Sequence, residues 1–337
     1  MLVAGALAVA GITGLFARGA VADPVLPPLS PSELLTRVAQ AKVDGLSATF
    51  EQRSDLGLPT LPTSGSDTGS LQSALTMLTG NHTVRVWIAG TDHARVALVD
   101  GSTETSAIRN GDQLWLWSSE KQQARHATLT AGEQPTAAPM SPTEAVQRLL
   151  AAVEPSTDVT TSGTGTVAGR PVYQLVLTPK DSASLVGQVR ISVDATQFVP
   201  LAARVIAADG SDAISVTATS VDFSRPDASI FAFTPPPGAD VSELKPPAAS
   251  AERPAKGTAK PTVVGSGWTT VAVTKLDPTK ADQTVTALLK SLPEVSGSWG
   301  NGRLLSTTLV NAVITDDGRV AVGSVTPERL YAALARK

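Results

Sequence analysis

The chain has 337 residues, of which 42% are hydrophobic and 17% are charged, and its formal net charge is −3 at pH 7. This length suits one large domain and a smaller one, and the mild negative charge argues against nucleic-acid binding, which needs a basic surface. The chain has no cysteine, which excludes disulfides, thiolate metal sites, cysteine catalysis and anchoring through a lipidated cysteine.

Residues 1–22 have the pattern of a targeting segment. Small and apolar residues fill positions 2–17, and Ala20-Val21-Ala22 has the A-x-A form of a cleavage site. The run is shorter than the roughly 20 residues that span a membrane. We therefore expect an exported, extracytoplasmic protein, either secreted after cleavage or anchored to the outer face of the plasma membrane through residues 1–22. A buried core helix is the remaining alternative.

Residues 23–238 are expected to form one large domain built mainly from antiparallel strands. Ser30-Pro31-Ser32-Glu33 predicts a helix start with Ser30 as N-cap and Glu33 completing a capping box. A strand at 46–53 follows. Beyond residue 83, short alternating segments rich in β-branched residues are separated by Gly, Asp and Pro, as in antiparallel sheets. They predict strands at 84–89, 94–99, 103–109, 113–117, 123–129, 158–167, 171–178, 185–194, 198–208, 213–223 and 230–233. A second Ser-Pro-x-Glu start at Ser141 predicts a helix at 141–153.

Residues 54–82 interrupt this pattern. A Gly/Pro/Ser/Thr-rich loop at 54–69 leads into a short helix at 70–79, in which Leu71, Leu75 and Leu78 share one face. A long irregular segment inside a compact domain is usually functional or disordered. We expect this one to form a lid.

The strand at 113–117 is apolar on both faces. Trp115 and Trp117 lie on one face, and Leu114 and Leu116 lie on the other. Antiparallel sheets normally expose one face to solvent. Because this strand is apolar on both faces, we expect both to be covered. Two interpretations stay open: a two-sided core, or a concave sheet lined with apolar side chains under the leucine lid. The second predicts the following ligand-binding residues: Leu71, Leu75, Leu78, Trp87, Trp115, Trp117, Tyr173 and Leu175.

The C-terminal part is expected to be a separate, small α+β domain. Residues 239–261 are rich in Pro, Ala, Lys and Glu and predict a semi-rigid linker. Residues 262–337 predict strands at 268–273, 304–314 and 320–325 and helices at 281–292 and 326–335.

Few residues suggest chemistry. His82, His93 and His126 lack the spacing of metal ligands. The S-x-x-K pattern formed by Ser118 and Lys121 falls in a turn and lacks the partners of that motif. We expect no catalytic residue, no metal and no cofactor, and a hydrolase is only a third hypothesis.

Four segments resemble a known family: 33–52, 110–117, 168–177 and 231–238. Within them, Leu46-Ser47-Ala48-Thr49-Phe50-Glu51-Gln52 and Asn110-Gly111-Asp112-Gln113-Leu114-Trp115-Leu116-Trp117 are similar to the first strand and the "n-G-x-x-l-W" strand of the LolA-type lipoprotein carriers. The actinobacterial LolA-like branch fits best, over about residues 30–238. The added domain, with its segments 302–305 and 318–327, resembles the two-domain layout of the RseB/MucB periplasmic regulators.

The resemblance implies a half-open, strongly curved antiparallel β-barrel with a helical lid on its concave side, and no catalytic motif. Members bind acyl chains of lipoproteins or related amphiphiles, and the regulators also bind an anti-sigma factor. We therefore expect a non-enzymatic protein that holds lipid or lipoprotein acyl chains in an apolar cavity. The alternative is an RseB-like regulator that binds an anti-sigma factor.

Overall fold

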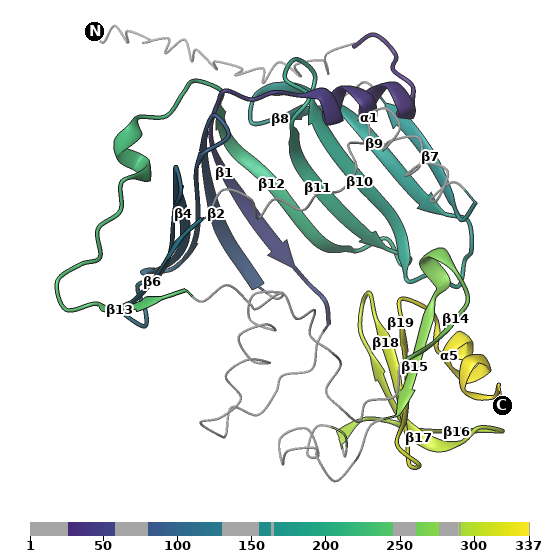
Figure 1. Cartoon of the computed structure of the whole chain (residues 1–337). Coiled ribbons are helices and arrows are strands. Elements are labelled where there is room, and N and C mark those ends of the chain that lie inside the picture. Colours follow the sequence, from purple (N-terminus) through teal and green to yellow (C-terminus); the bar gives the residue numbers. More distant parts are fainter. Residues whose placement is uncertain are drawn as a thin grey trace, which may run out of the picture.

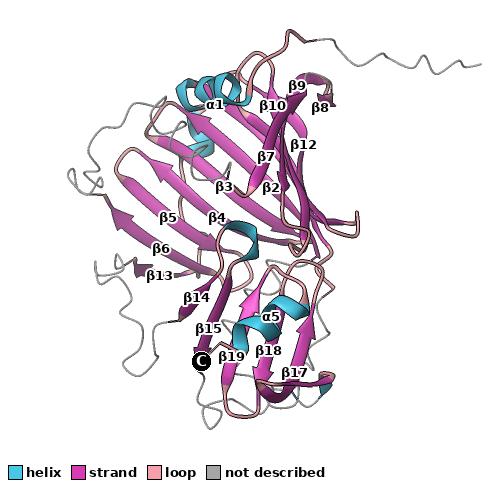
Figure 2. Ribbon diagram, turned by 90° about the vertical axis from the view of Figure 1, so that its right-hand side faces the viewer, coloured by secondary structure: helices cyan, strands magenta, loops and turns pink. Residues whose placement is uncertain are grey.

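The computed structural model describes residues 26–57, 80–129, 155–162, 165–244, 261–275, 289 and 291–336. In these ranges the chain forms a large curved sheet and a smaller one, with few helices (Figures 1 and 2). The expected curved, open and mainly antiparallel sheet is confirmed. The targeting segment, the predicted helices at 70–79 and 141–153, most of that at 281–292 and most of the linker lie outside the described residues.

The large sheet is two antiparallel meanders joined through the first strand. Its order is β13-β6-β5-β4-β3-β2-β1-β12-β11-β10-β9-β7, with β8 paired to β9, and β13 alone is parallel to its neighbour. The strands are β1 (Gly45–Ser54), β2 (Gly80–Ala89), β3 (His93–Asp100), β4 (Thr103–Asn110), β5 (Gln113–Ser118), β6 (Gln123–Thr128), β7 (Thr157–Ser162), β8 (Thr166–Val167), β9 (Arg170–Pro179), β10 (Val186–Asp194), β11 (Pro200–Ala207), β12 (Asp212–Asp222) and β13 (Asp240–Glu243).

Helix α1 (Pro31–Gln40) begins at the predicted capping box. The Glu33 backbone N–H donates to the Ser30 hydroxyl at 3.3 Å, and the Ser30 backbone N–H donates to the Glu33 carboxylate at 2.8 Å. This second bond is the largest of the interactions that lower the pKa of Glu33. The helix buries Leu34 completely, against Tyr173, Leu175 and Val193 of the sheet.

Replacing Ser30 with alanine should destabilise the protein by about 1 kcal/mol, because the Glu33 N–H at the helix start loses its acceptor and the capping box is broken. Urea unfolding followed by circular dichroism measures this change. Gln40→Ala is the matched control, since Gln40 is exposed at the other end of the same helix and alanine is the better helix former. Equal stability of the two variants would contradict the capping role.

After β12 the chain crosses the outside of the sheet to the opposite end (Figure 1). We call residues 223–244 the return segment. It contains the 3₁₀ helix η1 (Ala228–Phe231) where a strand at 230–233 was predicted, so that prediction is wrong. The Asp227 side chain accepts a hydrogen bond from the Ser229 N–H and so caps a tight helical turn. The segment ends in β13, inside the predicted linker.

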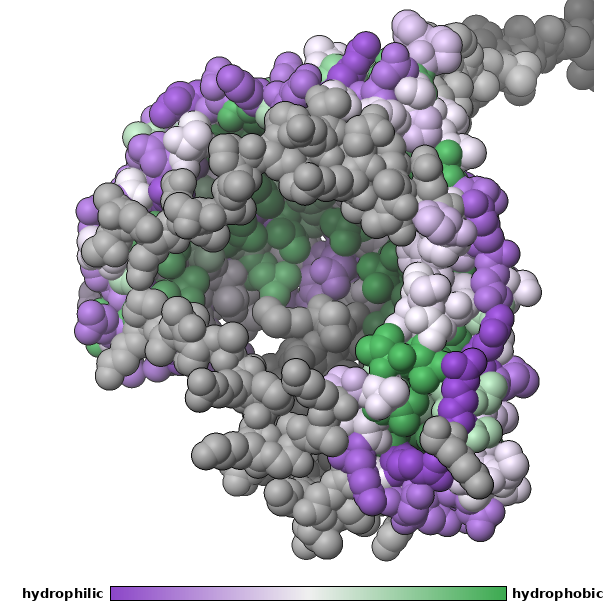
Figure 3. Space-filling model, turned by 45° about the vertical axis from the view of Figure 1, so that its right-hand side comes forward, coloured by the Kyte–Doolittle hydropathy of each residue, from purple (hydrophilic) through white to green (hydrophobic). Residues whose placement is uncertain are grey.

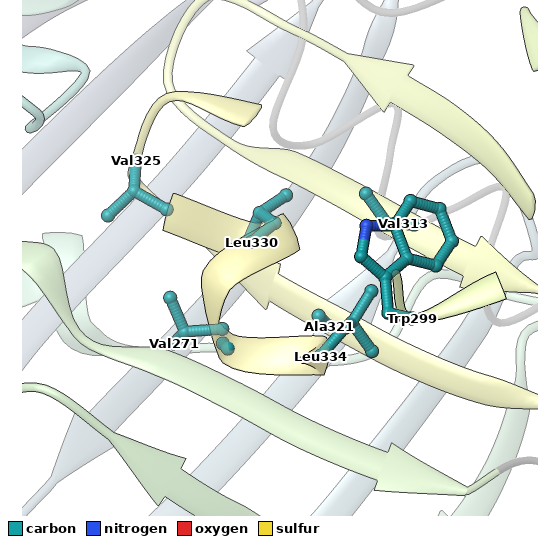
Figure 4. Packing of buried hydrophobic residues seen from close by; sticks show 8 residues of the cluster. Val271, Trp299, Val313, Ala321, Val325, Leu330 and Leu334 are labelled. Atoms are coloured by element: carbon teal, nitrogen blue, oxygen red, sulfur yellow. The ribbon is translucent and has the colours of Figure 1, made fainter. Parts of the chain in front are cut away.

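The small sheet has the order β14-β15-β19-β18-β17-β16, and helix α5 (Pro327–Leu334) packs against it. Its core contains the fully buried residues Val313, Ala321, Val325 and Leu330 (Figure 4). Trp299 stacks on Tyr331 with 5.5 Å between ring centroids. The elements are β14 (Thr262–Val264), η2 (Gly267–Thr269), β15 (Val271–Lys275), β16 (Glu294–Gly297), β17 (Gly300–Ser306), β18 (Asn311–Thr315), β19 (Arg319–Gly323) and α5 (Pro327–Leu334).

Three strand predictions need correction. The predicted strand at 268–273 begins as η2 and becomes extended only in β15. The predicted strand at 304–314 is two strands, because the Thr307 hydroxyl donates to the Val310 carbonyl and accepts from its N–H, which closes a turn. The predicted strand at 158–167 is likewise divided between β7 and β8.

The two sheets are packed together. Leu309, in the turn between β17 and β18, is buried in a cluster with Val186, Ala207 and Ala213 at the ends of β10, β11 and β12. The Trp268 indole N–H donates to the Thr157 hydroxyl at 2.7 Å. Backbone bonds from the 185 N–H to the 324 carbonyl and from the 326 N–H to the 183 carbonyl join the two parts of the molecule directly.

Candidate functional site

The large sheet has an inner and an outer face, which the covering elements identify. Helix α1 packs on the face that carries Tyr173 and Leu175. The return segment packs on the opposite face, where Phe233 contacts Trp115 and Trp117 at ring-centroid distances of 5.5 and 5.8 Å. Because the return segment runs outside the curve of the sheet (Figure 1), the α1 side is the inner face.

The inner face is apolar across several adjacent strands. The registers place Val86 opposite Val96, Val96 opposite Ala107, and Ala107 opposite Leu116, so these four side chains form one row across β2 to β5. Adjacent positions on this face hold Val84, Leu98, Ile191, Val205 and Val216. Figure 3 shows a hollow with many hydrophobic residues on its visible wall and a hydrophilic patch in its depth.

The central fact about this face is that Val96 is 43% exposed although it lies on an interior strand of the sheet. A large apolar side chain at such a position is normally buried by covering elements. An exposed apolar surface of this kind commonly marks an interaction site. The inner face can therefore hold an apolar guest through non-directional contacts.

The structure divides the described residues of the predicted site between the two faces. Tyr173 and Leu175 lie on the inner face but are only 5% and 4% exposed, because Leu34 of α1 covers them. Trp115 and Trp117 lie on the outer face under the return segment, and Trp87 lies there beneath the Arg95 guanidinium, 5.6 Å from its ring. Alternation along a strand shows which side chains share a face but not which face is concave. The lid residues Leu71, Leu75 and Leu78 lie outside the described residues.

Sequence reasoning did not single out the row from Val86 to Leu116. A signal for it was present, because the predicted hairpins around residues 90–93 and 110–112 fix which residues lie opposite one another. Combined with the alternation, these turns pair Val86 with Val96 and Ala107 with Leu116, and the turn between Asp100 and Thr103 joins the two pairs.

Several turn carboxylates of the described part of the large domain have lowered pKa values. In the described part of the chain, no three His, Asp or Glu side chains gather as metal ligands would. The hydroxyl and then the backbone N–H of Ser211 lower the pKa of Asp209, and Ser229 acts on Asp227 in the same way. These carboxylates are turn caps held ionised, whereas a general acid at neutral pH needs a raised pKa.

No helix among the described residues has the length and apolar character required to cross a bilayer.

The comparisons with known proteins point in one direction. Residues 72–236, a little under half of the chain, match the family model of the MucB/RseB N-terminal domain. No curated protein matches the sequence with significance. The chain is similar to the crystal structure of MucB in complex with MucA(peri), with 16% identity, a TM-score of 0.46, and coverage of 90% of this chain and 96% of that one.

Two further structures are similar. The MucA/MucB complex of Pseudomonas aeruginosa gives 15% identity, a TM-score of 0.44, and coverage of 90% of this chain and 96% of that one. A LolA superfamily protein from Nitrosomonas europaea gives 12% identity, a TM-score of 0.24, and coverage of 61% of this chain and 99% of that one. Since all three TM-scores are below 0.5, the assignment depends on the sequence match. The match of residues 72–236 to the model of the MucB/RseB N-terminal domain confirms the LolA-like and RseB-like resemblance of this chain.

Proposed function

We propose that this chain is an exported, non-enzymatic binding protein that holds acyl chains of a lipid or lipoprotein on the inner face of its large sheet. The observation that carries the proposal is the 43% exposure of Val96 in the middle of an apolar row. Burial of each acyl methylene contributes ~0.8 kcal/mol. A long chain therefore binds tightly without a hydrogen-bond network.

The neighbouring elements have roles consistent with this proposal. Helix α1 covers one end of the inner face with Leu34, while Leu71, Leu75 and Leu78 act as a lid over the bound chain. The targeting segment 1–22 takes the protein across the plasma membrane, where it is released or remains anchored. The domain expected at 23–238 extends through β13, and the remainder of the predicted linker 239–261 joins it to the domain at 262–337.

The decisive experiment is native mass spectrometry of gently purified full-length protein, in which a co-purifying lipid is expected. Titration with a fluorescent fatty acid then gives an affinity for the inner face. Protein that is empty and ignores the fatty acid would exclude the acyl-binding role.

Replacing Val96 with aspartate should weaken fatty-acid binding by roughly 100-fold, equivalent to about 3 kcal/mol, because the bound chain would cover an unpaired carboxylate. The matched control is Val263→Asp, since Val263 is 62% exposed in the small domain. Fluorescence titration compares the two variants. Equal affinities would place the bound chain elsewhere on the molecule.

The family match favours a second candidate, a regulator that binds an anti-sigma factor. The MucB structures named above contain MucA as a bound partner. If the full chain captured the exported segment of an anti-sigma factor from its own organism, while the purified protein carried no lipid and did not bind the fatty acid, the regulator would replace the carrier as the proposed function.

A further inference from the structure

The outer face of the large sheet carries a polar groove that the proposed acyl-binding role does not use. The groove has a volume of about 630 Å³ and lies over β8 to β12 and β1. Val167 and Ala202 are its apolar lining residues, and the remainder are charged, hydroxyl or amide side chains. The inner face of the same strands is apolar, so the sheet separates two surfaces of opposite character.

Three arginines cross this groove in a single row. The registers place Arg190 directly opposite Arg204, Arg204 opposite Ser215, and Ser215 opposite Arg53. Like charges placed directly opposite one another in a sheet are destabilising. A row of this kind needs neutralisation from within the protein or from a ligand.

The acidic residues of the groove neutralise two of the three arginines. Arg204 forms an ion pair with Asp212, and Arg53 pairs with Glu51 at 3.0 Å. The third carboxylate of the lining, Asp55, lies at the end of β1 beyond Arg53.

Arg190 differs from the other two arginines. Among the described residues no carboxylate forms an ion pair with it, and its terminal N–H donates to the Gln188 side chain at 2.8 Å. Its Nε is buried and has no hydrogen-bond partner. An unpaired buried donor on a charged group costs free energy. An oxyanion in the groove would neutralise the guanidinium by accepting from its terminal N–H groups.

The surroundings of Arg190 indicate what carries that oxyanion. Ser192, Ala202 and Thr217 form the adjacent row, so small side chains leave space beside the guanidinium. Hydroxyl and amide groups, including Gln174, provide donors and acceptors for ligand hydroxyls. The groove has no aromatic or large aliphatic wall apart from Val167, which makes it unsuited to an acyl chain or an apolar peptide side chain.

We propose that this outer groove binds a phosphate-bearing polyol, such as a glycerol phosphate unit, with Arg190 contacting the phosphate and the hydroxyl-lined floor contacting the polyol. The ligand is either a free phosphopolyol or the headgroup of an anionic lipid. The site lies across the sheet from the inner face and is independent of acyl binding there.

Calorimetric titration of the full chain with sn-glycerol 3-phosphate tests this site, with inorganic phosphate and glycerol compared at equal ionic strength. We expect glycerol phosphate to bind more tightly than phosphate, and glycerol not to bind. Arg190→Gln should weaken the binding at least tenfold. Arg85→Gln is the matched control, because Arg85 is an exposed arginine on the same outer face of β2 and does not line the groove.

Sedimentation with phosphatidylglycerol or phosphatidylcholine vesicles distinguishes the two ligand sources. Binding to phosphatidylglycerol vesicles that depends on Arg190 supports a headgroup, and binding of glycerol phosphate alone supports a free ligand. The proposal is overturned if neither probe binds, or if the Arg190 and Arg85 variants lose affinity equally, which would indicate general charge attraction.

The stability of the Arg190 variant separates a binding role from a structural one. Removing one of two opposed arginines should leave the Tm of the ligand-free protein unchanged or raise it. A large fall in Tm would assign Arg190 to the fold and would also overturn the proposal.

Discussion

Replacing Phe231 with alanine is expected to lower the free energy of unfolding by about 3–5 kcal/mol, as for other fully buried phenylalanines. Phe231 is 1% exposed and is among the largest fully buried side chains. Its ring packs edge-on to His93 at 5.6 Å, and the carbonyl of Ile230 beside it accepts a bond from Arg95 at 3.3 Å. This residue therefore fixes the return segment to the outer face of β3.

The effect should extend along the return segment to β13. The N–H groups of Asp240 and Leu244 donate to the carbonyls of Gln122 and His126 at 2.9 and 2.6 Å. Hydrogen exchange should show these amides losing protection in Phe231→Ala while β2 keeps its protection. The control is Val241→Ala, since Val241 is 53% exposed on β13 and should change little. Unaltered exchange at β13 in Phe231→Ala would show that β13 is held independently.

Replacing Asp194 with alanine is the second large perturbation, with an expected cost of about 3 kcal/mol. Asp194 is 1% exposed, and Arg170 donates to its two carboxylate oxygens at 2.5 and 3.2 Å. The same carboxylate accepts from the backbone N–H groups of Thr196 and Gln197 at 3.0 and 2.6 Å. The variant leaves the Arg170 guanidinium, which lies 4.7 Å from the Phe223 ring centroid, without its anion.

The pH dependence of stability gives an independent check on Asp194. Burial raises the pKa of Asp194, but hydrogen bonds from Arg170, Gln197 and Thr196 outweigh it, so the pKa is lowered overall. A carboxylate whose pKa is lower in the folded protein stabilises the fold at pH values above its pKa in the unfolded chain, about 4. This stabilisation is lost as the pH falls through the pKa of the carboxylate in the folded protein. Wild-type protein should therefore lose more stability than Asp194→Ala on acidification below pH 4.

Urea unfolding between pH 2 and pH 7 measures both effects. Glu51→Ala is the matched control, because its ion pair with Arg53 is largely exposed and such pairs contribute little. Equal stability of the Asp194 and Glu51 variants at neutral pH would show that the buried Asp194–Arg170 pair contributes no more to stability than the exposed Glu51–Arg53 pair.

Local chemistry explains which elements could be predicted from the sequence. Capping residues and proline fix helix starts within one turn, so α1 begins as predicted after Ser30, and α5 begins after Thr326. The turn Asn110-Gly111-Asp112 likewise fixes the hairpin of β4 and β5. These signals involve residues close together in sequence.

The missed elements depend on contacts distant in sequence. Strand β13 has the sequence Asp240-Val241-Ser242-Glu243, is exposed throughout, and exists because β6 offers a free edge. Residues 230–233 include β-branched and aromatic side chains, as strands do. They nevertheless form the end of η1 and then an extended crossing, in which Phe233 packs against the Trp115 and Trp117 rings. The same reason limited prediction of the site, since curvature of the whole sheet decides which face is concave.

The place of β1 within the sheet sets the order in which the protein can mature. Strand β1 pairs on one side with β2, the next strand described along the chain. On its other side it pairs with β12 (Asp212–Asp222), which is synthesised far later. Until then one side of β1 presents unsatisfied backbone groups, and closing such a distant pairing is slow. The two meanders therefore cannot unite before nearly the entire large domain has been made.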